Sequence, residues 1–91
     1  MFRVVLSCEG IPPHAGPQAA VDITEEFVSH RPWHQNVVCS WNEENQDLTL
    51  QADNDFDNSG LALMDEFSDA ITAYVKDAGE GDIRVLSAIR L

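Results

Sequence analysis

An amphipathic segment in the second half of the chain, residues 61–78, most constrains how this sequence can fold. Apolar side chains recur there every three or four positions, which predicts a helix with one face on a core. The predicted inward face consists of Leu61, Met64, Phe67, Ile71, Tyr74, Val75 and Ala78. Asp57, Asn58 or Ser59 is expected to cap the helix start, and Gly79 stands where a left-handed residue ends many helices. Such a helix needs another layer of structure to cover its inward face.

Four other segments alternate between apolar and polar residues, which is the pattern of half-buried strands. They comprise residues 2–9, 36–41, 47–52 and 82–90. In the first strand the even-numbered side chains are expected to face the core. In the last strand the odd-numbered ones are expected to do so, including Ser87 and Ile89, which leaves Leu86 and Ala88 on the open face. The polar turn at residues 42–46 predicts a hairpin between the middle two strands.

A weaker helical stripe occupies residues 18–30, with Pro17 suited to the first turn and Arg31-Pro32 ending the helix. The order of elements is therefore strand, helix, strand, strand, helix, strand, in one domain of residues 1–91. Right-handed crossovers place both helices on one face of a four-stranded antiparallel sheet with the strand order 4-1-3-2. This α+β arrangement resembles the ferredoxin-like sandwich.

That fold hosts many functions, and the motifs of three of its families are missing. RNA-recognition modules stack bases on aromatic side chains of the first and third strands. The corresponding positions here hold Val5, Ser7, Thr49 and Gln51. Heavy-metal chaperones carry a CxxC pair in the first loop and acylphosphatases an arginine that binds phosphate, and residues 10–16 contain neither. ACT-type sensing domains share the element order, but they have no short motif to test.

The net charge of −11, from sixteen acidic residues against five Lys and Arg, excludes other partner classes. It repels nucleic-acid phosphates and anionic lipid surfaces. No apolar run approaches 18 residues, and the N-terminus lacks the features of a signal peptide. The two cysteines, Cys8 and Cys39, form no CxxC pair, so we expect free thiols in a cytoplasmic protein.

The acidic residues have an expected position in the fold. Nine acids and no Lys or Arg lie between Arg31 and Lys76. In the predicted topology, the third strand ends beside the start of the first, at the N-terminus of the second helix. This end of the molecule, the polar pole, should gather Asp53, Asp55 and Asp57 with Arg3, Arg31 and Arg90. A structural interpretation has the aspartates cap the helix and pair with the arginines.

The alternative interpretation is a site for a metal or a small polar ligand at the same pole. Its candidate ligand-binding residues are Arg3, His30, His34, Asp53, Asp55 and Asp57. The alternating aspartates resemble the start of an EF-hand loop, but Asn58 stands where that loop needs glycine and Met64 where it needs glutamate. Pro32 separates the two histidines, so they cannot share a helix face as zinc ligands. We therefore assign no metal, cofactor or catalytic residue.

The sheet face away from the helices is expected to be small and half-apolar, with charges only at its ends. Such faces are often covered by a second subunit. The sequence thus favours a small acidic, non-catalytic interaction module that forms a homodimer through its open sheet face. Its acidic surface is expected to meet a basic protein partner or to remain solvated. A ligand-binding protein or enzyme with its site at the polar pole is the alternative.

Overall fold

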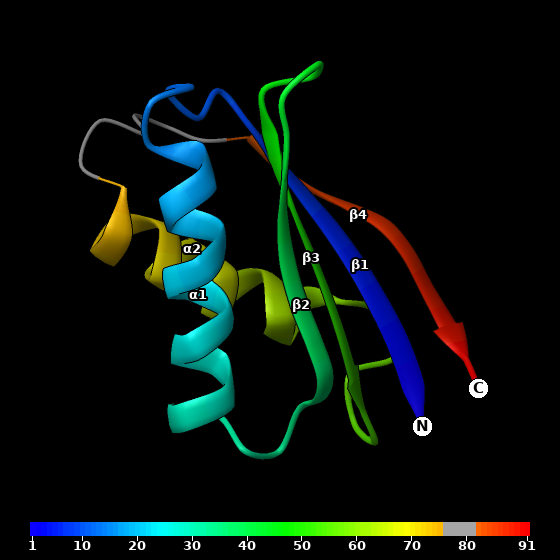
Figure 1. Cartoon of the computed structure of the whole chain (residues 1–91). Helices are drawn as coiled ribbons and strands as arrows, with labels where there is room; N and C mark the ends of the chain where they lie inside the picture. The colour runs from blue at the N-terminus through cyan, green and yellow to red at the C-terminus, as the bar shows by residue number, and fades with distance from the viewer. Residues whose placement is uncertain (76–81) are drawn as a thin grey trace.

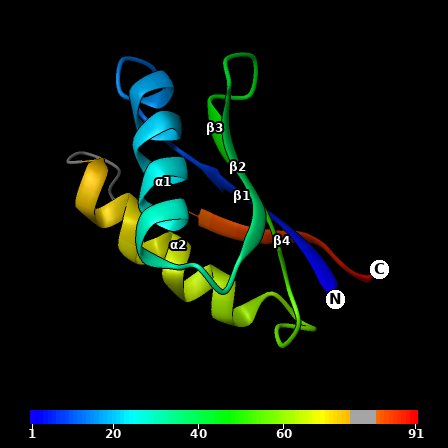
Figure 2. The ribbon, with the colours of Figure 1, turned by 60° about the horizontal axis from the view of Figure 1, so that its bottom comes forward.

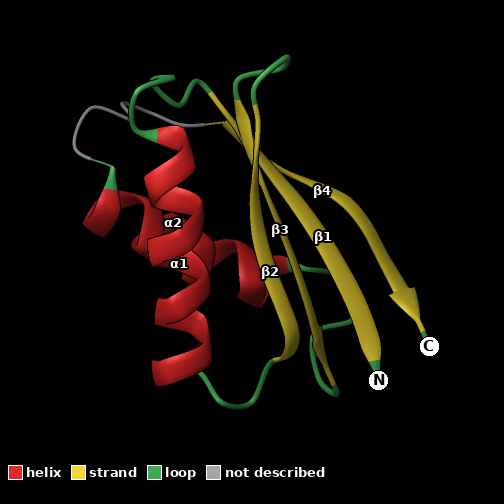
Figure 3. Cartoon of the chain, viewed as in Figure 1, coloured by secondary structure: helices red, strands yellow, loops and turns green. Residues whose placement is uncertain are grey.

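The computed structural model of this protein describes residues 1–75 and 82–91, and it confirms the predicted ferredoxin-like fold. The elements are β1 (Phe2–Glu9), α1 (Gly16–His30), β2 (Gln35–Asn42), β3 (Asp47–Asn54), α2 (Leu61–Tyr74) and β4 (Asp82–Arg90). The strands form one antiparallel sheet in the order β2-β3-β1-β4. Both helices cover the same side of this sheet, and β4 forms the margin farthest from α1 (Figures 1, 2 and 3).

The core fills the space between the sheet and the helices. The alternation in β1 is confirmed at its centre, because Val4, Leu6 and Cys8 are fully buried. Phe27 of α1 and Phe67 of α2 are also 0% exposed, and removing such large apolar surfaces from water is the main stabilising term. Neither described helix has the length and apolar character needed to cross a bilayer.

Close packing fixes the start of α1 against β2. A Cβ atom added to Gly16 would lie 2.3 Å from ring atoms of Trp41. Glycine at this position therefore lets the first turn of α1 rest directly on the indole ring. Pro17 follows within that first turn, where a missing N–H costs no hydrogen bond.

The inward face of α2 differs from the predicted one. Leu63 is fully buried, whereas Leu61 is 62% exposed and Tyr74 is 41% exposed. At about 100° per residue, Leu63 lies roughly 40° around the axis from the buried Phe67, and Leu61 roughly 120° from it. Leu63, rather than Leu61, therefore lies on the same buried face of α2 as Phe67. The helix ends at Tyr74, and the predicted positions Ala78 and Gly79 lie outside the described residues.

The facing of β4 was predicted wrongly beyond its middle. Leu6 of β1 pairs with Val85, whereas the preceding Val5 pairs with Ser87, so Leu86 has no partner on β1. A bulge of this kind shifts the alternation by one residue. Ala88 consequently packs on the core. Ser87 and Ile89 lie opposite Val5 and Arg3 and belong to the open side of the sheet.

Candidate functional site

Asp53 is held in an ion pair on the open side of the sheet. Its carboxylate oxygens accept hydrogen bonds from Nε and Nη2 of Arg3 at 2.9 and 3.0 Å, and from Nδ2 of Asn36 at 2.9 Å. The Asp53 side chain is only 2% exposed. The hydrogen bond from Arg3 is the main cause that lowers the pKa of Asp53, and the same contact raises the pKa of Arg3. The predicted pairing of an aspartate with Arg3 is therefore confirmed.

Asp57 caps the start of α2, as one of the three predicted candidates. Its Oδ1 accepts the N–H of Gly60 at 3.0 Å, and its Oδ2 accepts the N–H of Leu63 at 2.9 Å. A longer contact of 3.4 Å joins Oδ1 to the N–H of Ala62. Gly60 has a φ of 85°, a left-handed conformation that glycine adopts at little cost. The buried carboxylate thus satisfies backbone donors that a helix N-terminus leaves free.

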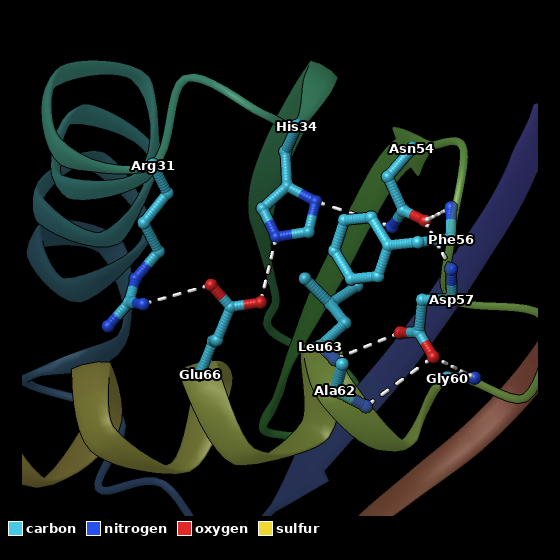
Figure 4. A network of polar contacts seen from close by, with 9 residues as sticks. All are labelled: Arg31, His34, Asn54, Phe56, Asp57, Gly60, Ala62, Leu63 and Glu66. Atoms are coloured by element: carbon cyan, nitrogen blue, oxygen red, sulfur yellow. Dashed lines mark hydrogen bonds and ion pairs between the residues drawn. The ribbon is translucent and has the colours of Figure 1, made fainter.

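Asn54 links this cap to His34 (Figure 4). The fully buried Asn54 accepts the N–H groups of Phe56 and Asp57 on its Oδ1, at 3.1 and 2.7 Å. These two donors fix the orientation of the amide, so Nδ2 is the atom that faces Nδ1 of His34 at 3.3 Å. Nδ1 must then be the acceptor. The ring proton therefore sits on Nε2 and is donated to Oε1 of Glu66 at 2.8 Å.

Glu66 completes the network by joining His34 to α1. Nη1 of Arg31 donates to its second oxygen, Oε2, at 2.9 Å. The His34 side chain is 0% exposed and its ring lies 5.8 to 6.0 Å, centroid to centroid, from those of Phe27, Trp33 and Phe56. A continuous chain of contacts thus runs from the end of α1 through His34 to the start of α2 (Figure 4).

The remaining predicted site residues lie outside this chain. Asp55 is exposed, and His30 is exposed with its Nε2 3.8 Å from Oε2 of Glu26. Arg31 pairs with Glu66 instead of an aspartate, and no ion pair of Arg90 is found among the described residues. The structure therefore brings Arg3 to Asp53 and links His34 to the Asp57 cap, but it does not gather the six residues. Among residues 1–75 and 82–91, no cluster of three or more His, Cys, Asp or Glu could hold a metal.

Sequence reasoning missed Asn54 and Glu66. Asn54 is the last residue of β3 and binds backbone groups two and three residues ahead, which is a typical use of asparagine in turns. That local signal could have been noticed. Glu66 carried no signal, because only the tertiary packing of α1 against α2 brings it to Arg31 and His34.

A groove of about 200 Å³ lies between the helices. Its lining residues are Asp22, Glu25, Glu26, Ser29, His30 and Tyr74. The Tyr74 hydroxyl donates to Oε2 of Glu26 at 3.0 Å, and this contact raises the pKa of Tyr74. The groove was not expected, because Tyr74 was assigned to the core. The carboxylates of this groove favour a positively charged neighbour. Among the described residues, however, the polar groups there form no arrangement that is specific for one kind of ligand.

The two cysteines are free and buried, as the sequence predicts. Burial is the main cause that raises the pKa of Cys8 to about 11 and of Cys39 to about 12. The thiolate is the nucleophilic form of cysteine. Neither thiol is therefore suited to nucleophilic catalysis at neutral pH.

No family model, curated protein or solved structure matches this chain. The surfaces of the molecule itself must then indicate its function. The open side of the sheet carries the exposed apolar side chains Val38 and Ile89, each 52% exposed, with Leu86 at its margin 57% exposed. The charges of Arg3 and Asp53 on the same side neutralise each other.

Proposed function

We propose that this protein is a non-catalytic interaction module that works as a homodimer, associating through the side of the sheet that the helices leave open. The observation that carries the proposal is the exposure of Val38 and Ile89 on that side. Apolar side chains exposed on a sheet favour contact with another protein. A two-fold dimer is the commonest arrangement that covers such a surface.

A non-catalytic role is supported by the way the polar groups are used. Asp53, Asp57 and His34 each bond to groups within the protein. A ligand at the polar pole would have to displace these contacts, and that loss counts against the alternative of a ligand-binding protein or enzyme.

With the sheet side occupied, the helices are left to meet other molecules. Their outer surface carries acidic residues, among them those lining the groove between α1 and α2. Such a surface fits a basic protein partner. The two free thiols support a cytoplasmic location.

Multi-angle light scattering on the purified chain tests the homodimer. Lysine at both Val38 and Ile89 should shift the mass from dimer to monomer, because it places four charges in the apolar contact of the dimer. Val28→Lys is the matched control, since Val28 is 63% exposed on α1 and should leave the mass unchanged. A chain that is monomeric at about 1 mM, a concentration at which even very weak complexes form, would overturn the proposal.

A further inference from the structure

The register of the sheet arranges the side chains of the open side in rows that run across the four strands. The middle row is uncharged and consists of Val38, Gln51, Val5 and Ser87. The adjacent row towards the polar pole holds Ile89 and the ion pair of Arg3 with Asp53. The adjacent row on the other side consists of Ser40, Thr49, Ser7 and Arg84. These three rows contain one acidic residue, Asp53, and Arg3 neutralises it.

The end of the open side that lies farthest from the polar pole is strongly acidic. Asp82 lies opposite Glu9 on the neighbouring strand, and Asp47 begins β3 at the same end. Residues 43–44 are exposed glutamates in the turn that joins β2 to β3. Arg84 neutralises Asp82, with the two side chains 3.2 Å apart, but the other carboxylates at this end have no ion pair among the described residues. Two copies of the chain cannot place these ends together without repulsion.

Two such sheets can stack face to face about a two-fold axis that runs either along the strands or across them. An axis along the strands would lay one acidic end on the other and would set Val38 against Ser87 of the second copy. An axis across the strands reverses their directions, so that Val38 meets Val38 and Val5 meets Val5. It also carries the two acidic ends to opposite sides of the dimer. Charge and apolar contact therefore both favour the axis across the strands.

We propose that two copies stack through their open sheet sides with reversed strand directions, and that the row of Val38 and Val5 lies on the two-fold axis. This inference rests on the proposed homodimer and gives its orientation. Each chain carries −11, so a second copy can approach closely only where the surface carries little charge, as these rows do. Ile89, one row from the axis, then faces Arg84 of the second copy, whose aliphatic stem can cover it. Both exposed side chains that carry the proposed homodimer are thus in the contact.

Distances between spin labels test this orientation. A nitroxide attached at Asn45→Cys lies in the exposed turn between β2 and β3, about 20 Å from the Val38 row at about 3.3 Å per strand residue. Reversed copies should hold the two labels about 40 Å apart. Copies with the same strand direction would hold them within about 25 Å, because stacked sheets lie only about 10 Å apart. Cys8 and Cys39 are buried, so the unmodified chain is the control for labelling elsewhere.

A mixed dimer gives the complementary distance. Asp55→Cys places a label on an exposed residue at the polar pole. In the reversed arrangement, the Asn45 end of one copy lies over the pole of the other. A label at Asn45→Cys in one chain and a label at Asp55→Cys in the other should therefore be closer together than two labels at Asn45→Cys.

A substitution on the axis tests which row lies there. Val5→Lys should raise the dimer dissociation constant at least about 10-fold, because two lysines would then meet in an apolar contact. Val21→Lys is the matched control, since Val21 is 51% exposed on α1, and it should not weaken the dimer.

The possible failures are distinguishable. A dimer with its two Asn45→Cys labels within about 25 Å would overturn the reversed orientation and leave the proposed homodimer standing. A dimer that is weakened by lysine at Val38 and Ile89 but not by Val5→Lys would overturn the position of the axis alone. A monomer at about 1 mM would overturn both the orientation and the homodimer.

Discussion

The polar pole and the β4 edge differ in whether their hydrogen-bonding groups already have partners. At the pole, Asn54 and Asp57 each accept backbone donors with their buried side chains, and His34 is bonded through both ring nitrogens. Along β4, the outward backbone groups have no described side-chain partner from another element. The region richest in histidine and aspartate is thus satisfied by contacts within the protein, whereas the edge strand β4 keeps outward backbone groups without such partners among the described residues.

This difference shows why residue type alone is a poor guide to function in this chain. Aspartate and histidine in the loops of a small domain can bind a ligand or can hold the loops together, and buried hydrogen bonds decide between the two. Four substitutions test how much the hydrogen bonds of each region contribute to the stability of the fold. They run from the largest expected effect on the free energy of unfolding to the smallest.

Asn54→Ala should have the largest effect. It removes the acceptor of two backbone N–H groups and the donor to His34 Nδ1, all in a fully buried position. We expect a loss of about 3 kcal/mol, since each buried group left without a partner costs about 1–3 kcal/mol. Urea unfolding at neutral pH measures it, with the exposed Asn45→Ala as the control. If the two variants were equally stable, the hydrogen bonds of Asn54 would not contribute to the stability of the pole.

Asp57→Ala and Asp55→Ala compare two acids of the same segment. Asp57 binds backbone donors at the start of α2, whereas Asp55 is exposed. Removing the Asp57 cap should cost about 2 kcal/mol, and removing Asp55 less than about 0.5 kcal/mol. Thermal or urea unfolding of both variants checks the difference. If Asp55→Ala were the more damaging, the segment would have a role other than capping.

The fold was predictable because it depends on patterns repeated over many residues. The alternation of β1 and the helical spacing around Phe67 predicted the strands and helices. The rule of right-handed crossovers predicted how they are arranged. The faces of α2 and β4 were less predictable. A single unpaired residue, Leu86, reverses the second half of β4. In α2 the four-residue spacing from Leu63 to Phe67 was a local signal for the inward face, but the predicted stripe began at Leu61 instead.

The candidate site was predictable only in part. Charge and topology correctly predicted that Arg3 pairs with an aspartate of this segment, which is Asp53, and included Asp57 among the caps of α2. The contact of His34 with Glu66 joins a loop to the middle of a helix 32 residues away. Such a contact depends on how α1 and α2 pack, and therefore on the complete tertiary structure.

Thr24→Val tests how α1 covers the other edge strand, β2, where the Thr24 hydroxyl accepts the N–H of Cys39 at 3.0 Å. Valine has nearly the same shape as threonine but cannot accept the Cys39 N–H, so this buried donor loses its partner. The expected cost is about 1 kcal/mol, together with faster hydrogen exchange at Cys39. Thr72→Val is the control, because the Thr72 hydroxyl is exposed and bonds only within its own helix. Unchanged exchange at Cys39 would mean that Thr24 does not protect this backbone group, and the two edge strands, β2 and β4, would then be equally uncovered there.

Asp53→Asn probes the pole through pH, and its effect should be no larger than that of Thr24→Val. The pKa of Asp53 is lowered in the folded state, chiefly by the hydrogen bond from Arg3. Its ionised form therefore stabilises the fold above the ordinary aspartate pKa of about 4, and this contribution disappears as the pH falls through the lower folded value. We expect Asp53→Asn to cost about 1 kcal/mol at pH 7, with the difference from the unmodified protein shrinking below about pH 4. Asp55→Asn should show no such convergence. A difference that stays constant from neutral to acidic pH would mean that the Arg3–Asp53 ion pair contributes nothing through its charge, and only its hydrogen bonds would then hold this part of the pole.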